Sequence, residues 1–412
     1  MRHLCYAQSS PGASKLETLF YYLAVTQIAI GAYLLWQGLR WLAYAKRRLR
    51  GDPGFYAPKA AVLCPCKGME PGLEHNLLAL AEFDYRDYEI FFVLASASDA
   101  AYSTVKRVAE QSKHPAHVII AERPEACGEK VNNLRVAVEQ LPVEFEVLVF
   151  ADSDGCPGRT WLRRLVAPLH HSHAGATTTM RWLIPKRQNP ASALLATWNA
   201  SVVTMLSEHG KNFCWGGGTA IKRKVFDDIR VLNEWRNSVS DDYSMTRALQ
   251  HANRSIVFVP DCLTPSYIEA DFKSLLEFTN RQILITKVYA HKMWSAGALT
   301  HFMYCLTLAL GTYLTLTNVL ATLPAFHLAI LTFLPLLLSA IHGGLRVAAA
   351  MEMIPTARSQ ISAQGWMYLM YGALVPFLFL LNFALSVFTR KIRWRGVTYE
   401  LISPQQTRIL AY

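Results

Sequence analysis

The sequence has few charged residues for its length. Only 17% of its 412 residues are Asp, Glu, Lys or Arg, whereas 52% are hydrophobic. Soluble domains have about 25% charged residues, so this composition argues against a wholly soluble protein. Acidic residues are fewer than basic residues, 30 against 41, which gives a formal net charge of +11.

The sequence also lacks a nucleic-acid-binding pattern that would explain the positive charge, and it lacks a metal-binding spacing of its cysteines. No interleaving of aromatic and basic residues typical of a nucleic-acid module is present, so nucleic acid is not an expected partner. Basic residues beside apolar segments are better explained by anionic lipid headgroups. No C-x-x-C spacing occurs, so we predict reduced, structural thiols rather than a zinc site or a disulfide framework. The cysteines are Cys5, Cys64, Cys66, Cys127, Cys156, Cys214, Cys262 and Cys305.

Long apolar runs are present instead. Residues 16–44 contain a charge-free core of about twenty residues, enough to cross a bilayer as a helix. Four basic residues follow between Lys46 and Arg50. No small-residue cleavage site follows the run, which favours an anchor over a signal peptide. By the positive-inside rule the next domain is cytosolic, and we expect an integral membrane protein, in the inner membrane if the host is a bacterium.

Two further apolar blocks lie near the C-terminal end. Residues 298–350 are long enough for two spans with Pro324 near the turn, and residues 366–389 are long enough for one more. Residues 351–365 are predicted to lie along the membrane surface. Four full spans would put the basic tail, residues 390–412, outside the cell, against the positive-inside rule. Either one block is re-entrant or interfacial, or the tail departs from the rule.

Residues 46–297 read as one α/β domain. Short apolar runs alternate with helical patterns, which predicts a parallel sheet covered on both faces, with ligands bound beyond the carboxyl ends of its strands. The predicted strands are 60–64, 88–94, 117–120 and 145–150. Three polar segments fall at strand ends and are expected to meet in one cleft: 65–68, 96–99 and 152–154.

The segment LVFADSDGCP, residues 148–157, ends a predicted strand in two carboxylates. Strand periodicity places Asp152 and Asp154 on the same side, where they can share a divalent cation. Mg²⁺ or Mn²⁺ prefers such oxygen ligands, and either ion would offset the charge of a diphosphate. The alternative is a strand followed by an Asp-rich turn.

Two later segments carry further candidates. The three glycines 216–218 would allow the backbone to approach a ligand closely, although a flexible turn has the same composition. Asp241 and Asp242 precede a helical pattern in SVSDDYSMTRAL, residues 238–249. One of them can cap the helix, and one can accept a proton as a general base.

The ordered motifs resemble the ceramide glucosyltransferases, membrane glycosyltransferases of the family 2 and family 21 type. Hopanoid-modifying bacterial relatives are similar. The resemblance rests on PCKG (65–68), YEIFFVLASASD (88–99), GEKVNNL (128–134), FADSDG (150–155), GGGTAIKRKVF (216–226), SDDYSM (240–245) and W-R-G-x-x-Y (394–399). It implies a GT-A, nucleotide-diphospho-sugar transferase fold with a mixed, mostly parallel sheet, flanked by transmembrane helices.

The resemblance also implies roles for individual residues. Asp99 would lie near the uracil and ribose of a UDP-sugar, while Asp152 and Asp154 would hold Mg²⁺ or Mn²⁺. Asp242 would act as the catalytic base, with Asp241 beside it. The remaining residues assigned to the donor site are Pro65, Lys67, Lys130 and Asn133.

The sequence departs from the family at two places. Residues 96–98 are Ser-Ala-Ser, where relatives are richer in acidic residues. The Q/R-x-x-R-W motif should begin near Arg281, but this chain has Leu284 and Ile285 in place of the Arg-Trp pair. Either Arg281 and Gln282 take over the work of that pair, or activity is altered. We count Arg281 among the catalytic candidates.

Together these features predict an inverting transfer of one hexose, glucose in the first instance, from a UDP-sugar to a lipid hydroxyl such as that of ceramide. The reaction would occur at the cytosolic face, so the partners are the donor, a membrane lipid acceptor and the bilayer. Two alternatives stay open. One is a processive polysaccharide synthase, and the other is a non-catalytic membrane scaffold that retains the fold.

Overall fold

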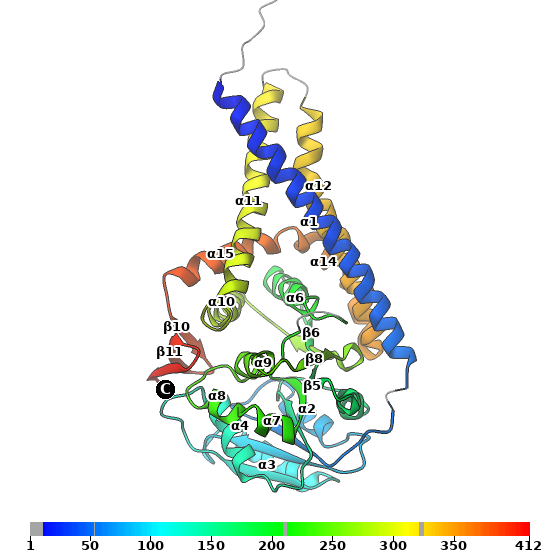
Figure 1. Cartoon of the computed structure of the whole chain (residues 1–412), viewed down its shortest axis with the longest axis vertical. Helices are drawn as coiled ribbons and strands as arrows, with labels where there is room; N and C mark the ends of the chain where they lie inside the picture. The colour runs from blue at the N-terminus through cyan, green and yellow to red at the C-terminus, as the bar shows by residue number, and fades with distance from the viewer. Residues whose placement is uncertain (1–10, 53, 209–211, 321–324) are drawn as a thin grey trace, which may run out of the picture.

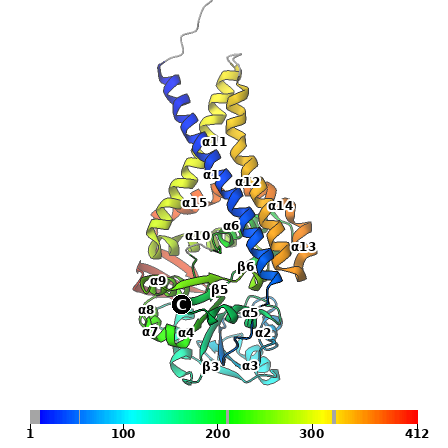
Figure 2. The same cartoon turned by 45° about the vertical axis from the view of Figure 1, so that its right-hand side comes forward.

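The computed structural model describes residues 11–52, 54–208, 212–320 and 325–412, so Cys5 and the predicted turn at Pro324 lie outside the described residues. An α/β domain forms one end of the molecule, and three long helices rise together from it (Figures 1 and 2). These helices are α1 (Pro11–Arg50), α11 (His291–Leu320) and α12 (Phe326–Met353).

The domain is built on a seven-stranded sheet with the order β3-β2-β1-β4-β7-β5-β8. Strand β7 runs antiparallel to both of its neighbours, and the other pairs are parallel. The expected mixed, mostly parallel α/β sheet is therefore confirmed. The strands are β1 (Ala60–Pro65), β2 (Tyr88–Leu94), β3 (Ala116–Ile120), β4 (Val147–Ala151), β5 (Ala174–Thr178), β7 (Gly218–Lys222) and β8 (Ser255–Phe258). A separate parallel pair joins β6 (Arg181–Pro185) and β9 (Thr264–Ile268).

The central strands are apolar along their whole length because helices cover both faces of the sheet. In β1, Val62 and Cys64 join one core cluster, whereas Ala61 and Leu63 join the cluster on the opposite face. This alternation follows from the two-residue period of a strand. The covering helices include α2 (Leu73–Leu80), α3 (Tyr102–Gln111), α4 (Glu129–Gln140), α5 (Trp161–Val166), α7 (Arg223–Asp228), α8 (Val231–Trp235) and α9 (Asp241–His251).

Two helices lie between the sheet and the long helices (Figure 1). Helix α6 (Pro190–Val203) begins after Asn189, whose side chain accepts from the Ser192 N–H, and Pro190 occupies its first turn. Helix α10 (Phe272–Tyr289) begins with a capping box between Asp271 and Ser274. Both starts are therefore encoded locally by their capping residues.

Helices α1, α11 and α12 are long and apolar enough to cross a membrane, with mean hydropathies of 1.5, 1.3 and 1.9. They pack closely through small residues, since a Cβ on Gly311 of α11 would lie 2.2 Å from the Thr332 hydroxyl of α12. The region of the expected span at 366–389 consists of α14 (Gly365–Gly372) and α15 (Val375–Val387), with a bend of 59° between them, so it is either one broken span or a re-entrant segment. The short helix α13 (Arg358–Ala363) precedes them.

The basic tail forms a small antiparallel sheet of β10 (Lys391–Trp394), β11 (Val397–Ser403) and β12 (Gln406–Ala411). It packs on the α/β domain beside α10 (Figure 1). One buried cluster combines tail residues with residues of the domain: Ile392, Val397, Tyr399 and Leu401 with Val239, Leu284 and Ile285. The backbone N–H of Glu129 also donates to the Tyr399 hydroxyl, at 3.2 Å. The tail is thus an integral part of the domain.

Candidate active site

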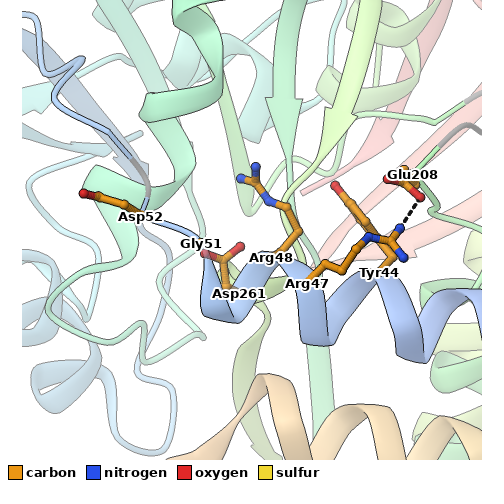
Figure 3. Close-up of a pocket in the computed structure, with 7 residues that line it drawn as sticks. All are labelled: Tyr44, Arg47, Arg48, Gly51, Asp52, Glu208 and Asp261. Atoms are coloured by element: carbon orange, nitrogen blue, oxygen red, sulfur yellow. Dashed lines mark hydrogen bonds and ion pairs between the residues drawn. The ribbon is translucent and has the colours of Figure 1, made fainter.

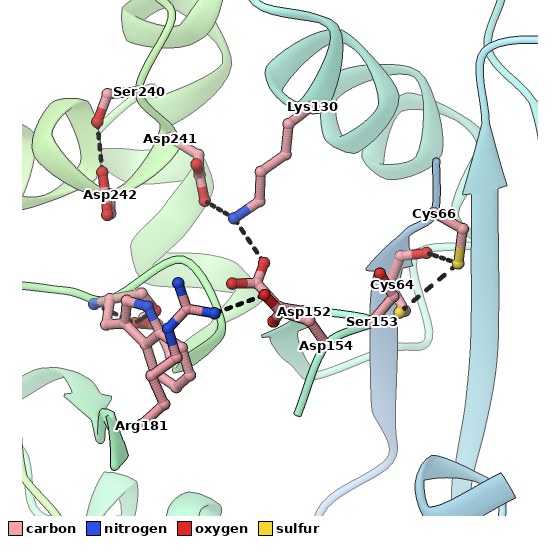
Figure 4. Close-up of polar contacts among 12 residues, drawn as sticks. Cys64, Cys66, Lys130, Asp152, Ser153, Asp154, Arg181, Ser240, Asp241 and Asp242 are labelled. Carbon is pink, nitrogen blue, oxygen red and sulfur yellow. Dashed lines mark hydrogen bonds and ion pairs between the residues drawn. The ribbon is translucent and has the colours of Figure 1, made fainter. Parts of the chain in front are cut away.

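Asp152 and Asp154 follow β4 at its carboxyl end, and the charges of both carboxylates act on Arg181 (Figure 4). Each has a cationic partner. Lys130 Nζ lies 2.7 Å from Oδ1 of Asp152, and a guanidinium nitrogen of Arg181 lies 2.5 Å from Oδ2 of Asp154. The other oxygen of Asp154 is buried and has no hydrogen-bond partner among the described residues. Such an orphaned oxygen is suited to a divalent cation.

The second acidic pair lies at the start of α9. Asp241 is buried, and its Oδ2 lies 3.4 Å from Lys130 Nζ, so Lys130 connects the two acidic pairs (Figure 4). Asp242 is partly exposed, and its Oδ1 accepts from the Ser240 hydroxyl and, at 2.8 Å, from the Tyr243 N–H. The residue that caps α9 is Ser240, so the prediction that Asp241 or Asp242 would cap this helix is wrong, and both aspartates lie in its first turn. The N-terminus of α9 stabilises the negative charge of Asp242.

The buried charges perturb one another. Burial raises the pKa of Asp241 to about 6, against the opposing effect of Lys130 and with a further contribution from Asp242 and Asp152. Burial lowers the pKa of Lys130, but the carboxylates of Asp152 and Asp241 outweigh it, so that the pKa is raised. The pKa of Asp154 is lowered because Arg181 outweighs the effect of burial. The site therefore holds a lysine firmly protonated between two acids.

The glycines at 216–218 allow this arrangement. A Cβ on Gly216 would lie 2.2 Å from Oδ2 of Asp241, and one on Gly217 would lie 2.5 Å from Oδ2 of Asp152. No side chain fits at either position without moving a carboxylate. The backbone here approaches the acidic side chains closely, and its approach to a ligand stays a prediction.

A pocket of about 610 Å³ lies at the ends of β1 and β2. Asp99 is in its lining, and the Oδ1 atom accepts from the N–H groups of Gly68 and Ala101, each at 2.8 Å. Lys67, also in the lining, forms an ion pair with Glu129 at 2.7 Å. The segments 65–68 and 96–99 thus meet as expected, and the Ser153 hydroxyl contacts Glu70 at the pocket's edge.

Four of the predicted donor-site residues do not line this pocket: Lys130 and Asp152, which belong to the acidic cluster, and Asn133 and Pro65. Asn133 is only 2% exposed, and its amide donates to the Val93 carbonyl at 3.4 Å, beneath the end of β2. Pro65 is the last residue of β1 and pairs in register with Val93. In the structure both therefore lie where they support the strand ends that carry Lys67 and Asp99.

Arg281, the remaining candidate, lies on α10 between two aromatic rings. Its guanidinium carbon is 5.2 Å from the centroid of the Phe278 ring and 5.3 Å from that of Trp394. Burial and the charges of Arg181 and Arg395 lower its pKa to about 10. The three arginines thus share one positive region beside Asp154.

Sequence reasoning missed Arg181, Glu70 and Arg395 as members of this site. Arg395, in the turn between β10 and β11, donates to the Lys67 carbonyl at 2.8 Å and forms an ion pair with Glu70. The W-R-G-x-x-Y motif contains Arg395 and was the available sequence signal for it. The basic charge of the tail had been related only to membrane topology. Arg181 has no motif around it.

A second pocket, of about 170 Å³, lies at the domain end of α1 (Figure 3). It is lined by Tyr44, Arg47, Arg48, Gly51, Asp52, Glu208 and Asp261. An ion pair of 2.6 Å between Arg47 and Glu208 spans part of it. This pocket contains none of the four clustered aspartates and shares no residue with the pocket that contains Asp99.

Comparison with known proteins places the chain in a family of glycosyltransferases. The model of the family described as Glycosyl transferase family 21 matches residues 19–407. Among solved structures, the chain is similar to a mannosyltransferase from Pyrobaculum calidifontis in complex with GDP-Man and Mn²⁺, at 18% identity and a TM-score of 0.45, covering 88% of this chain and 98% of that one. It is also similar to GalNAc-T7 with UDP, GalNAc and Mn²⁺, at 12% identity and a TM-score of 0.42, covering 57% of this chain and 48% of that one.

Proposed function

Because the chain belongs to glycosyl transferase family 21, as its ordered motifs predicted, we propose that it transfers one hexose from a UDP-sugar to a lipid hydroxyl with inversion at the sugar carbon. Membership confirms the expected GT-A type fold and the glycosyltransferase class of enzyme. The finer proposal, glucose as the sugar and ceramide as the acceptor, rests on the resemblance of the motifs. The main observation in support of this reaction is that Lys130 contacts one aspartate of each acidic pair, Asp152 of the pair 152/154 and Asp241 of the pair 241/242.

The residues present fit a divalent cation, either Mg²⁺ or Mn²⁺. Asp152 and Asp154 would hold it, since they are adjacent carboxylates and one buried oxygen of Asp154 lacks a partner among the described residues. Among those residues no group of three or more His, Cys, Asp or Glu side chains gathers as a ready-made metal site, so the donor diphosphate and water would complete the coordination. When bound, the ion supplies positive charge for the departing diphosphate.

The pocket beside Asp99 and Lys67 suits the nucleoside of the donor. It opens at the carboxyl ends of parallel strands, where ligands of open α/β sheets bind. Glu70, which lines the pocket, accepts a hydrogen bond from Ser153, so a nucleoside in the pocket would direct its diphosphate towards Asp152 and Asp154. This continuity supports a nucleotide-sugar as the donor.

Asp242 is the residue best placed to accept a proton. One of its oxygens is fixed by Ser240 and the Tyr243 N–H, and the side chain is partly exposed, unlike that of Asp241. The acceptor hydroxyl would attack the sugar C1 atom, Asp242 would take its proton, and the bond between C1 and the diphosphate oxygen would break to release UDP. A single displacement of this kind inverts the configuration and needs no covalent enzyme intermediate.

The membrane arrangement favours a lipid acceptor at the cytosolic face. Arg47, Arg48 and Arg50 end α1, and this excess of basic charge favours a cytosolic domain. The tail packs on the same domain, so both lie on one side of the membrane, and the chain between them must cross it an even number of times. We propose that α11 and α12 provide two crossings and that α14 and α15 lie in the interface as a bent pair.

The test is transfer by the purified protein in detergent micelles that contain ceramide. UDP-glucose, UDP-galactose and UDP-N-acetylglucosamine are supplied separately with MnCl₂, and mass spectrometry identifies the lipid products. We expect one glycolipid that is one hexose heavier than ceramide, formed on the order of 10²-fold more slowly, or slower still, by an Asp242→Asn protein. Products with several added sugars would support the processive synthase instead. Nucleotide-sugar binding with no transfer to ceramide, diacylglycerol or hopanoid acceptors would contradict the lipid proposal.

A further inference from the structure

The turn between β10 and β11 carries tail residues into the donor pocket. Trp394 pairs with Val397, which leaves Arg395 and Gly396 as a two-residue turn whose φ angles are 45° and 87°. Such a turn favours Asn-Gly or Gly-Gly, because an ordinary side chain at positive φ is strained. An arginine kept in a strained conformation beside a ligand pocket indicates a function for its side chain.

Arg395 lies near both the pocket and the paired aspartates. It lines the pocket together with Gly396 and Val397, and it donates to the Lys67 carbonyl at 2.8 Å. Its ion-pair partner Glu70 accepts, at 3.3 Å, from the hydroxyl of Ser153, the residue between Asp152 and Asp154. A diphosphate that runs from the pocket to these aspartates would pass the guanidinium of Arg395.

The tail is held there by the residues that depart from the family motif. Leu284 and Ile285, which stand where the motif has Arg-Trp, are buried in the cluster that docks Ile392, Val397 and Tyr399 of the tail. The same docking brings the Trp394 ring to 5.3 Å from the Arg281 guanidinium. The tail thus presents a tryptophan and an arginine beside Arg281, although α10 itself has neither at the expected positions.

On the basis of the proposed function, we propose that Arg395 is a donor-binding residue that contacts the diphosphate of the nucleotide-sugar. Its planar guanidinium can donate two parallel hydrogen bonds to phosphate oxygens. In the absence of donor, the Glu70 carboxylate takes the position of the anion. Donor binding then exchanges one anionic partner of Arg395 for another, so the arginine is never left unpaired in the pocket.

The experiment measures binding to the full-length protein by calorimetry in detergent with MnCl₂. The probes are UDP, GDP, uridine and guanosine. For the diphosphate that the wild type binds, Arg395→Gln is expected to weaken affinity at least tenfold and to leave the affinity for the corresponding nucleoside unchanged. Arg393→Gln is the matched control, because it removes the same charge from an exposed position on the same hairpin. It should bind the diphosphate like the wild type.

A structural role makes a different prediction for Glu70→Gln. If Arg395 only fastened the turn to Glu70, this substitution would weaken diphosphate binding as much as Arg395→Gln. We expect it instead to bind the diphosphate at least as tightly as the wild type. Where Arg395→Gln does not fold, Arg395→Lys replaces it, with an expected loss of at least threefold because lysine lacks the fork. Equal affinities of the Arg395 and Arg393 variants would overturn this inference alone, whereas a wild type that binds neither UDP nor GDP would overturn the proposed function as well.

Discussion

Lys130 Nζ lies 2.7 Å from Oδ1 of Asp152, so that the first turn of α4 is tied to the end of β4. The same ammonium lies 3.4 Å from Asp241. A cation bound to Asp152 would therefore share this carboxylate with a lysine. Both positive charges would face the diphosphate, which is the part of the donor that gains charge as UDP departs.

We predict that transfer requires a divalent cation. Excess chelator should abolish product formation, and Mn²⁺ or Mg²⁺ should restore it, because the diphosphate would otherwise lack its counter-ion. Asp152→Ala should abolish transfer at any concentration of metal, while Asp228→Ala, which removes an acid on the exposed side of α7, should not. Full activity of the wild type in chelator would contradict the metal assignment.

Asp242→Asn is predicted to lower kcat by on the order of 10² or more and to change UDP affinity by less than about threefold. The amide keeps the contacts with Ser240 and Tyr243 but cannot accept a proton from the lipid hydroxyl. Steady-state kinetics and calorimetry on the same preparation separate the two effects. The opposite pattern, mild for Asp242→Asn and severe for Asp241→Asn, would assign the base to Asp241.

Arg281→Lys is predicted to preserve membrane insertion and to lower the rate of sugar transfer at least tenfold. A tenfold loss corresponds to an increase of about 1.4 kcal/mol in the activation free energy. The guanidinium lies between the Phe278 and Trp394 rings, and an ammonium does not reproduce its planar stacking. Protease protection in vesicles reports insertion, and the transfer assay reports activity. A correctly inserted Arg281→Lys protein with wild-type rates would show that this arginine provides only the positive charge at the membrane boundary.

The buried carboxyl of Asp241 should make stability depend on pH. Its pKa is about 6 in the folded protein and 3.8 in an ordinary setting, so the folded state binds the proton more tightly than the unfolded state. Stability contributed by this group is complete below about pH 4 and is lost as the pH rises to about 6, with a maximum effect of about 3 kcal/mol. The melting temperature of the wild type should therefore fall more between pH 4.5 and pH 7 than that of Asp241→Asn. Equal changes in the two proteins would contradict the shifted pKa.

Gly216→Ala should lower activity strongly, because the added methyl group would displace Asp241 and Lys130. Gly158→Ala is the control, since a Cβ at Gly158 would meet no atom within 4 Å and its φ is not positive. We expect transfer to fall at least tenfold in the first variant and to remain within about twofold of the wild type in the second. Thermal unfolding of both proteins reports whether the loss is confined to the site. A Gly216→Ala protein with wild-type activity would show that the carboxylates need not lie so close to this backbone.

Local patterns in the sequence were sufficient for the first four strands, β1 to β4, and for the acidic motifs, whereas the later strands were not predicted. The run YEIFFVL forms β2 within the predicted limits, and Asp152 and Asp154 follow β4 as its alternation requires. The long apolar runs likewise identified the regions of α1, α11 and α12. These features depend on neighbours a few residues away, because the strand and helix periods, the capping preferences and the length of a membrane span are local properties of the chain.

Only the tertiary structure decided which side chains share the site. Asn133 belongs to a motif, yet the packing of α4 under the sheet turns its amide to the end of β2. Arg395 and Lys67 are 328 residues apart, and their contact exists because Leu284 and Ile285 bury one face of the tail sheet. The tail that follows α15 packs on the domain through the same buried cluster. Sequence alone determined many of the elements and the charges, whereas contacts between distant segments, which no local period encodes, determined which of those charges meet.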